Sequence, residues 1–250
     1  MKMPVRVLLV GAAGRMGQAI TRAAETADEI EIAARCNRGD AIEPALASSD
    51  VVIDFSHADA TEHNCSACVA AGMPLVIGTT GHSNAQTEAV GRAAKTIPIV
   101  LAANFSVGVN TLFWLTRRAA ELLGDGFDIE IIETHHRLKK DAPSGTAKRL
   151  AQIVAAAREL NYDRDIAHGR EGMIGERPQS QIGMHAIRGG DVVGEHTVLF
   201  ASNGERLELT HKASSRETFA VGALRAARWI IGKPPGLYSM EDVLGLTVRD

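Results

Sequence analysis

The sequence predicts an α/β protein with two parts, a doubly wound parallel sheet followed by an α+β part whose sheet is mixed or antiparallel. Two observations favour this fold class. Through residue 105, short apolar runs rich in β-branched residues alternate with segments of helical periodicity. Further along the chain, strand candidates follow one another with only glycine-containing turns between them, as antiparallel strands do. A chain of 250 residues is long enough for two such domains.

The first part contains five strand candidates, four of them followed by a helix candidate. The strands are expected at Val5–Gly11, Glu29–Cys36, Val51–Ser56, Pro74–Gly81 and Pro98–Phe105. The helices are expected at Arg15–Ala27, a very short Glu43–Ser48, Ala58–Ala71 and Ser83–Lys95. Right-handed crossovers bring the carboxyl ends of all these strands to one edge of the sheet, where cofactors bind.

A glycine turn, GAAGRMG, joins the first strand to the first helix. Gly11 permits the tight turn, Gly14 lets a pyrophosphate approach the backbone, and Gly17 lets the helix pack on the strand. The spacing is GxxGxxG, because Ala13 stands where the more common pattern has its middle glycine. In this strand–turn–helix context the motif predicts a Rossmann-like dinucleotide-binding domain. The cofactor-binding residues expected in the turn are Gly11, Ala12, Ala13, Gly14, Arg15 and Met16.

The second part begins with a helix over Gly108–Leu123 and a strand over Asp128–Glu133. A helix over Thr146–Leu160 follows, and the polar, glycine-rich stretch Asn161–Gln179 is expected to be a surface loop. Residues 185–213 then alternate as strand, turn, strand, turn, strand, with Gly189-Gly190 and Asn203-Gly204 at the turns. An amphipathic helix over Glu217–Gly232 ends the predicted elements.

The stretch Glu133–Ala147, ETHHRLKKDAPSGTA, lies between a predicted strand and a predicted helix. Ser144 is a good N-cap, and Gly145 lets the backbone come close to a ligand. The free N–H groups of a helix start bind anions, so possible acids (His135, His136 and Lys139) stand beside a cradle for a carboxylate or phosphate. This combination suits proton delivery to an anionic substrate. The alternative is a solvated basic loop, and the apolar elements on both sides favour the functional interpretation.

The same stretch resembles the signature of the 4-hydroxy-tetrahydrodipicolinate reductases, also called dihydrodipicolinate reductases, of the lysine pathway. Further matching motifs span nearly the whole chain in the family's order: GAAGRMG, VIDFS, VIGTTG, AANFSVGVN, GEHTVLF and THKASSRETFA. The resemblance implies reduction of 4-hydroxy-tetrahydrodipicolinate to tetrahydrodipicolinate with loss of water, in lysine and diaminopimelate biosynthesis. The hydride would come from NADH or NADPH, and the substrate would be a small cyclic dicarboxylate.

The resemblance also implies roles for individual residues. His135 and Lys139 match the positions of the catalytic acids. The substrate-binding candidates are His136, Ser144, Gly145, Thr146 and Arg216. The remaining cofactor-binding candidates are Asn37, Arg38, Gly78, Thr79, Thr80, Ala102, Ala103, Asn104 and Phe105. Thr80 would touch substrate from the cofactor side.

The resemblance predicts a dinucleotide-binding domain at residues 1–105 and 219–250, and a substrate-binding and oligomerisation domain at residues 106–218 of a homotetramer. Exposed strand edges of the second domain would invite pairing between copies.

Several of these residues have a plainer alternative. His136 and Phe105 could belong to the core, and Arg216 could be a surface charge at a helix start. His196 and His211, in predicted strands, are more typical of structural histidines, and the role of His57 at a strand end stays open.

The choice between NADH and NADPH depends on the end of the second strand. NAD-selective sites usually place an acidic residue there, which accepts hydrogen bonds from the ribose. Here Asn37 occupies the position, with Arg35 and Arg38 on either side, and Asp40 could substitute only if the loop folds back. Guanidinium groups match a 2′-phosphate in geometry and charge. We therefore expect use of both cofactors with NADPH favoured; in the alternative, these arginines are ordinary surface charges.

Composition excludes several classes of partner. The net charge is −3, only 4% of residues are aromatic, and no basic patch is visible, so no nucleic-acid partner is expected. No run approaches the ~18 apolar residues of a membrane span, and no signal-peptide pattern precedes the first strand, so the expected location is the cytoplasm. Cys65 and Cys68 form a CxxC pair within a predicted helix, with no second pair to complete a zinc site. No metal site is expected, and small buried thiols are the better interpretation.

Two rival functions remain at this stage. One is another two-domain nicotinamide reductase, such as an aspartate or homoserine dehydrogenase, which would need the strand–helix half but not HHRLKKDAPSGTA. The other is a sensor that binds the cofactor without turnover.

Overall fold

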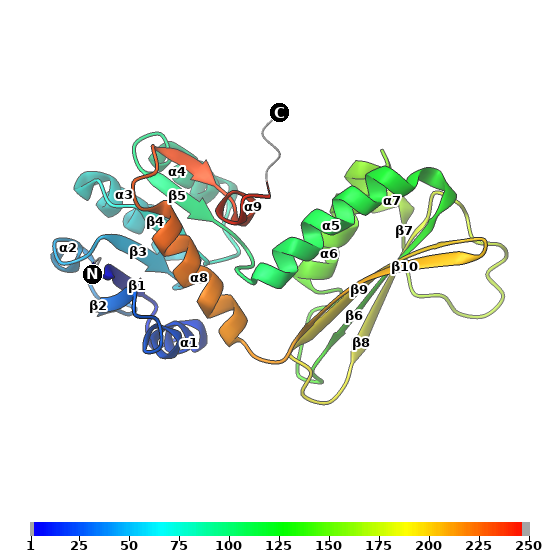
Figure 1. The fold of residues 1–250 in the computed structure, drawn as a ribbon, viewed down its shortest axis with the longest axis horizontal. Helices are drawn as coiled ribbons and strands as arrows, with labels where there is room; N and C mark the ends of the chain where they lie inside the picture. The colour runs from blue at the N-terminus through cyan, green and yellow to red at the C-terminus, as the bar shows by residue number, and fades with distance from the viewer. Residues whose placement is uncertain (1–2, 247–250) are drawn as a thin grey trace. The chain divides into compact units, whose positions relative to one another are not determined.

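The structure is a computed structural model that describes residues 3–246. Its contacts divide the chain into two compact units. Unit 1 comprises Met1–Val107 and Arg216–Asp250, and unit 2 comprises Gly108–Ser215. The chain therefore passes from unit 1 to unit 2 and back (Figure 1).

Unit 1 contains a six-stranded sheet in the order β11-β5-β4-β3-β1-β2. Every neighbouring pair in it is parallel, which confirms the predicted doubly wound sheet. The strands are β1 (Val5–Val10), β2 (Ile30–Cys36), β3 (Val51–Asp54), β4 (Leu75–Ile77), β5 (Pro98–Leu101) and β11 (Gly236–Tyr238). Their register aligns the carboxyl ends of β1, β3, β4 and β5, the edge at which the candidate cofactor residues follow.

Both faces of this sheet are covered, which explains the continuous apolar run of β1. Val7 and Leu9 pack into the core shared with α1 (Arg15–Ala24), α8 (Glu217–Ile230) and α9 (Met240–Leu244). Leu8 and Val10 pack on the other side against α2 (Glu43–Leu46), α3 (Thr61–Ala71) and α4 (Asn84–Ala93). Each fully buried aliphatic side chain of this kind contributes about 1.5–3 kcal/mol.

Sequence reasoning missed two elements of unit 1, β11 and α9. The strand β11 has only three residues and pairs with Pro98–Val100 of β5, far away in the sequence. Periodicity cannot reveal so short a strand, because its partner is nonlocal. Within α3, Cys65 and Cys68 are buried free thiols, as predicted, and burial raises the pKa of Cys65 to about 11.

Unit 2 contains a five-stranded mixed sheet in the order β10-β9-β6-β8-β7. Its strands are β6 (Asp128–His135), β7 (Ile166–His168), β8 (Ile182–Arg188), β9 (Gly194–Ser202) and β10 (Glu205–Ala213). The central strand β6 is antiparallel to β9 and parallel to β8. The prediction of a second α+β domain with a mixed or antiparallel sheet is confirmed.

Two details of the unit 2 prediction were wrong. The stretch Asn161–Gln179 is not only a loop, because it contains the short helix α7 (Tyr162–Asp165) and strand β7. Gly189-Gly190 does not form a hairpin turn, since β6 lies between β8 and β9. Asn203-Gly204 does form one between β9 and β10, where Gly204 has a φ of +93°.

The core of unit 2 lies between its sheet and the helices α5 (Val107–Leu123) and α6 (Gly145–Ala157) (Figure 1). Ile129 and Ile131 of β6 are buried in this core. Side chains alternate across a strand, so Glu133 continues the same inward-facing stripe, and it is fully buried. The described residues also include two short 3₁₀ helices, η1 (Ala58–Ala60) and η2 (Gly124–Gly126). Within residues 3–246, no helix has the length and apolar character to cross a membrane.

Candidate functional site

The glycine turn of unit 1 has the geometry that its sequence predicts. Gly11 has a φ of +82°, and a Cβ added there would lie 2.5 Å from the Phe55 carbonyl oxygen. A Cβ on Gly17 would lie 2.3 Å from the Gly11 carbonyl oxygen, so the close contact between helix and turn requires glycine. Gly14 is the N-cap of α1, and no side chain caps that helix. The N–H groups of its first turn are therefore suited to receive a phosphate.

A cavity of about 800 Å³ adjoins this turn at the carboxyl edge of the sheet. Its lining includes Gly11, Gly14, Asn37, Arg38, Asp40, Phe55 and His57. The Asn37 Oδ1 atom accepts a hydrogen bond from the Ala13 N–H at 2.7 Å, so this side chain fixes the glycine turn. The loop after β2 does fold back, because the Asp40 carboxylate accepts a hydrogen bond from the Asn37 N–H at 2.8 Å. Arg38 is exposed on the same cavity.

The candidate residues after β4 and β5 also follow the carboxyl edge. A Cβ on Gly78 would lie 2.2 Å from the Phe55 ring, so glycine makes room for that ring. Thr79 is buried, whereas Thr80 is exposed. Phe105 is buried in the core of unit 1 and lies in a tilted pair with Phe55, ring centroids 5.4 Å apart. Ala102, Ala103 and Asn104 precede it directly after β5.

A buried carboxylate that sequence reasoning missed joins two of these loops. Asp54, at the end of β3, is 1% exposed. It accepts hydrogen bonds from the Ser56 N–H and hydroxyl at 2.8 and 2.6 Å, the Asn64 amide at 2.8 Å and the Thr79 hydroxyl at 3.2 Å. The only sequence signal was an acidic residue that ends an apolar strand. Asp54 therefore ties the loop after β3 to the loop after β4 through neutral donors.

In unit 2, the Glu133 carboxylate contacts residues near both ends of the ETHHRLKKDAPSGTA stretch. Its Oε2 atom lies 2.5 Å from His135 Nδ1, and its Oε1 atom accepts from the Ser144 N–H at 3.0 Å. Arg188 donates to both carboxylate oxygens, at 2.9 and 2.8 Å. Neither Glu133 nor Arg188 received a role from the sequence. Arg188 is 55 residues away from Glu133 in the chain, and no local sequence pattern indicates that the two side chains form an ion pair.

Burial and hydrogen bonding oppose each other in this cluster. Burial disfavours ionisation of Glu133, but the bonds from Arg188, His135 and Ser144 outweigh it and hold the pKa of Glu133 below its ordinary value. Burial lowers the pKa of His135, although Glu133 opposes that shift. Burial outweighs the effect of Glu133, and the neighbouring cations Lys139 and Arg188 disfavour an imidazolium further. His135 is therefore neutral at neutral pH.

The start of α6 is built around Ser144, which is buried. Its Oγ atom accepts from the Ala147 N–H at 3.2 Å, as an N-cap does, and lies 3.0 Å from His196 Nε2. Gly145 is exposed, and a Cβ added there would meet no atom within 4 Å. There is thus free space beside Gly145 at this helix start.

His196, predicted to be structural, belongs to this site. It is 4% exposed, and its ring packs edge-on against His135 with centroids 5.2 Å apart. Burial lowers the pKa of His196 to about 4. His196 is therefore a neutral partner for both Ser144 and His135.

The other candidates of the loop are less enclosed. Lys139 is 20% exposed, and its Nζ atom donates to the Asp141 carboxylate at 2.8 Å. His136 is half-buried and its backbone N–H donates to the Val192 carbonyl. Arg216 is exposed and precedes α8 in unit 1.

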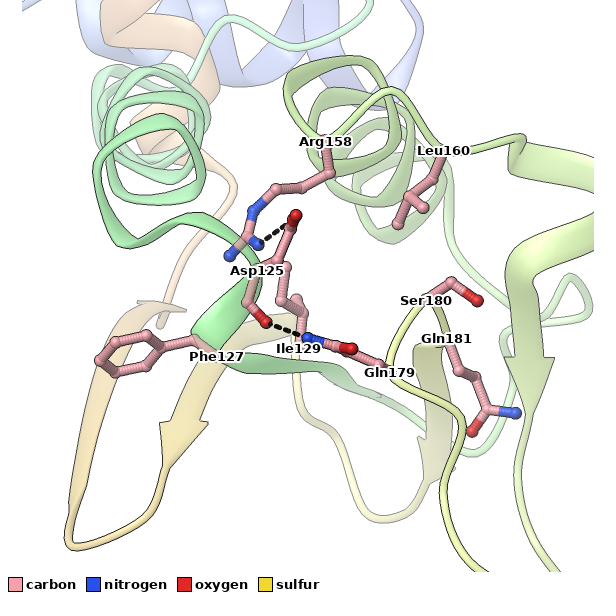
Figure 2. Close-up of a pocket in the computed structure, with 8 residues that line it drawn as sticks. All are labelled: Asp125, Phe127, Ile129, Arg158, Leu160, Gln179, Ser180 and Gln181. Carbon is pink, nitrogen blue, oxygen red and sulfur yellow. Dashed lines mark hydrogen bonds and ion pairs between the residues drawn. The ribbon is translucent and has the colours of Figure 1, made fainter.

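A separate cavity of about 390 Å³ lies near the other end of β6 (Figure 2). Phe127, Ile129 and Leu160 form its apolar lining, and Arg158 donates to the Asp125 carboxylate beside it at 3.1 Å. Phe127 and His135 are eight positions apart in the chain, about 25 Å at the rise of a strand. This cavity therefore stands apart from the histidine cluster. Across the described chain, residues 3–246, no three His, Cys, Asp or Glu side chains stand together in a way that could hold a metal ion.

The fold and these groups define a class of protein. A glycine turn with an uncapped helix start, on a parallel sheet with an adjoining cavity, fits a dinucleotide. The second unit supplies a histidine, a lysine and an open helix start, the groups needed to bind an anion and move a proton. Together they define a nicotinamide-dependent oxidoreductase.

The comparisons with known proteins identify the family. Residues 5–105 match the family model described as dihydrodipicolinate reductase, N-terminus, and residues 108–244 match dihydrodipicolinate reductase, C-terminus. The chain belongs to the dihydrodipicolinate reductase family, and the resemblance predicted from its motifs is confirmed.

Individual relatives agree over the full length. The chain is 56% identical over 243 residues to a 4-hydroxy-tetrahydrodipicolinate reductase of Akkermansia muciniphila, covering 97% of this chain and 99% of the relative. It is 47% identical over 264 residues to the enzyme of that name from Anaeromyxobacter dehalogenans, covering 96% and 98%. Among solved structures, the dipicolinate-bound dihydrodipicolinate reductase of Paenisporosarcina has a TM-score of 0.80 at 23% identity, covering 95% of this chain and 98% of that one. That structural likeness supports the fold.

Proposed function

We propose that this protein reduces 4-hydroxy-tetrahydrodipicolinate to tetrahydrodipicolinate, with loss of water, in lysine and diaminopimelate biosynthesis. The observation that carries the proposal is the cluster at Glu133–Ser144, where a neutral His135 and the open helix start of α6 share one buried anchor. This cluster lies in a chain that is 56% identical to a relative bearing the reductase name.

The substrate is a cyclic dicarboxylate, and its carboxylates need donors. One carboxylate is bound by the N–H groups of Gly145 and Thr146 together with the Ser144 hydroxyl, because a helix start favours anions and there is free space beside Gly145. His136 and Arg216 make further contacts with the substrate. The Paenisporosarcina structure holds dipicolinate, a cyclic dicarboxylate, which supports this chemical class for the substrate.

The dinucleotide binds to unit 1. The turn from Gly11 to Met16 cradles the pyrophosphate at the uncapped start of α1, and Asn37 and Arg38 are next to the adenosine ribose. Gly78–Thr80 and Ala102–Phe105 hold the nicotinamide end. When bound, NADPH or NADH supplies the hydride.

NADPH is the favoured cofactor in this proposal. Asn37 is a neutral amide whose oxygen already binds the Ala13 N–H, so it is not the ribose-binding carboxylate of an NAD-selective site. Arg38 is exposed on the cavity and its guanidinium suits a 2′-phosphate. Asp40 folds back to the same loop and can accept from a ribose hydroxyl, which accounts for use of both cofactors.

The proton that completes the reduction comes from Lys139. The neutral His135 donates its Nδ1 proton in a hydrogen bond to Glu133. The Lys139 ammonium has three N–H donors, and one of them is hydrogen-bonded to the Asp141 carboxylate. Asp141 is exposed, so an entering substrate can replace it as the hydrogen-bond partner of Lys139. His135 then orients the substrate as an acceptor through Nε2.

The experiment is a steady-state assay with freshly generated 4-hydroxy-tetrahydrodipicolinate and either reduced cofactor. The expected result is oxidation of both cofactors, with a higher kcat/KM for NADPH. Turnover with aspartate or homoserine and their oxidised partners instead would favour the rival dehydrogenases. Cofactor binding without oxidation would favour a sensor.

Assembly and location are further parts of the proposal. The sheet face of unit 2 opposite α5 and α6 presents Ile132, Leu199 and the half-exposed Ile187, which favours burial of this face between copies in a homotetramer. Sedimentation at micromolar concentration tests this: a monomer alone would contradict it. Biosynthetic chemistry of this kind places the enzyme in the cytoplasm, which cell fractionation tests.

A further inference from the structure

Glu133 is a carboxylate at the end of an otherwise apolar inward-facing stripe, and it is fully buried. An unpaired carboxylate in such a place would be strongly unfavourable. Arg188 compensates for the burial of this charge with a bidentate contact, donating to both carboxylate oxygens at 2.9 and 2.8 Å. The pair therefore holds a fixed, ionised acceptor inside unit 2.

This ion pair is attached to both ends of the loop that contains Lys139. At one end Glu133 binds His135, and at the other it accepts from the Ser144 N–H at 3.0 Å. Arg188 adds a bond from its Nη2 atom to the Asp141 carbonyl at 2.7 Å. His135 and the start of α6 are thus held in position by the same Glu133–Arg188 ion pair.

The carboxylate also decides the protonation pattern of the imidazole. An ionised carboxylate only accepts hydrogen bonds, so the Nδ1 atom of His135 that faces it carries the proton. In the neutral ring the Nε2 atom is then an acceptor. The space beside Nε2 is kept by Gly194, where an added Cβ would lie 3.1 Å away.

We propose that Glu133 is a positioning residue of the active site, which fixes His135 in its Nδ1–H tautomer and holds the start of α6 in register with it. The inference rests on the proposed function and deepens it. It assigns His135 the part of acceptor toward the substrate and makes the Glu133–Arg188 pair the support for both ends of the loop.

The first test uses the wild-type protein and needs no turnover. Nitrogen NMR of histidine-labelled protein distinguishes the two neutral tautomers, and the His135→Gln variant assigns the signal. The expected signal is that of the Nδ1–H tautomer at neutral pH. An Nε2–H tautomer would overturn the proposal. Because the readout is structural, it stands even if the reductase assay fails, so the two failures are distinguishable.

The second test is Glu133→Gln, which keeps the shape and removes the charge. A neutral amide can donate to Nδ1 as well as accept from it, so the tautomer signal should become mixed or inverted. The value of kcat should fall by roughly ten- to a thousand-fold with NADPH affinity unchanged, since loss of the group that orients a histidine lowers catalysis strongly.

The activity profile with pH gives a third readout. His135 faces Glu133 on β6, Arg188 on β8, His196 on β9 and Lys139 in the loop. Of these groups, Glu133 is the only negative one, so its loss should move the acid limb of kcat/KM to lower pH. A purely structural part for Glu133 would lower stability and leave the position of this limb unchanged.

Glu130 offers a matched control on the same strand and on the opposite face. It too binds arginine in a fork, from Arg170 at 2.9 and 2.7 Å, and it contacts His185 at 2.7 Å. Glu130→Gln therefore breaks a similar ion cluster. It should leave the His135 signal and the acid limb at their wild-type positions. If Glu133→Gln and Glu130→Gln gave the same His135 signal and the same pH profile, the proposal would fail. If Glu133→Gln did not fold, the tautomer of His135 in the wild-type protein would still support or overturn the proposal.

Discussion

The two units each contain a helix start suited to an anion, and they are built in opposite ways. The α1 start follows a glycine turn, has no side-chain cap, and is fixed from outside by the neutral Asn37 side chain. The α6 start is capped by the buried Ser144, which is tied to Glu133 and next to His196. The α1 start therefore offers backbone N–H groups without a side-chain cap, whereas the α6 start is held in place by the buried Glu133–Arg188 ion pair.

The difference fits the ligand proposed for each start. A pyrophosphate extends over several residues and needs many backbone donors at short range, so small residues matter most at α1. A compact dicarboxylate that must meet a proton donor needs one fixed geometry, so rigidity matters most at α6. Steric changes should therefore damage the first start, and changes of charge or hydrogen bonding should damage the second.

The largest expected effect is at the α6 side. His135→Ala and Lys139→Ala should each lower kcat by roughly 10²–10⁴-fold, since Lys139 is the proposed proton donor and His135 is the group that orients the substrate for it. NADPH binding should stay near normal, because both residues belong to unit 2. Steady-state kinetics and fluorescence titration of NADPH measure the two quantities, and wild-type turnover in both variants would refute the mechanism.

Adding one methyl group to each start should separate the two designs. Gly11→Ala places a Cβ 2.5 Å from a backbone oxygen at a φ of +82°, so it should destabilise unit 1 by about 2 kcal/mol or more and weaken both cofactors. Gly145→Ala meets no atom, so the unfolding free energy should change by less than about 1 kcal/mol while KM for substrate rises. Urea unfolding and kinetics check this. Unchanged KM in Gly145→Ala would place the substrate elsewhere.

The pH dependence of stability should be concentrated in unit 2. His196 has a pKa near 4 in the fold and an ordinary value of 6.5, so the unfolded chain binds more protons in between. The contribution of the neutral His196 to the free energy of unfolding is fully present above pH 6.5 and is lost as pH falls toward 4. Between pH 7.5 and 5 the free energy of unfolding should fall by about 2 kcal/mol from this group.

The measurement for this pH effect is urea unfolding followed through Trp114 of α5, with Trp229 of α8 replaced by phenylalanine to silence unit 1. His196→Gln should have the shallower pH slope of the two proteins. Equal slopes would show that His196 does not titrate as its burial implies.

The smallest expected effect concerns the cofactor edge. Arg38→Ala should weaken NADPH by about tenfold, about 1.4 kcal/mol, and NADH far less, since only NADPH has the 2′-phosphate. Arg35→Ala is the companion variant: Arg35 is exposed on β2 and is not among the residues that line the cavity, so its loss should change NADPH binding less than the loss of Arg38. Equal losses for the two cofactors, or a wild-type preference for NADH, would count against the arginine assignment.

What could be predicted from the sequence follows the same division between local and distant contacts. The glycine turn, the strand before it and the N-cap at Ser144 depend on neighbouring residues, so local pattern revealed them. The insertion of β6 between β8 and β9, and the pairing of β11 with β5, depend on residues far apart, so periodicity could not.

The same holds for the site. Residues in the ETHHRLKKDAPSGTA loop could be named because motif and resemblance coincide there. Arg188 and His196 could not be assigned, since their importance comes from contacts with Glu133 and Ser144 across the sheet. Asp54 was missed for the same reason, because its partners lie in three separate segments.

In the proposed reaction this chain passes a hydride from the nicotinamide to the lysine-pathway substrate. The most direct test is a single turnover with NADPH that carries deuterium at the transferable position of the nicotinamide. One deuterium is expected in the tetrahydrodipicolinate product, identified by mass spectrometry, at the rate of cofactor oxidation. Product without deuterium, or cofactor that stays reduced in the presence of substrate, would contradict it.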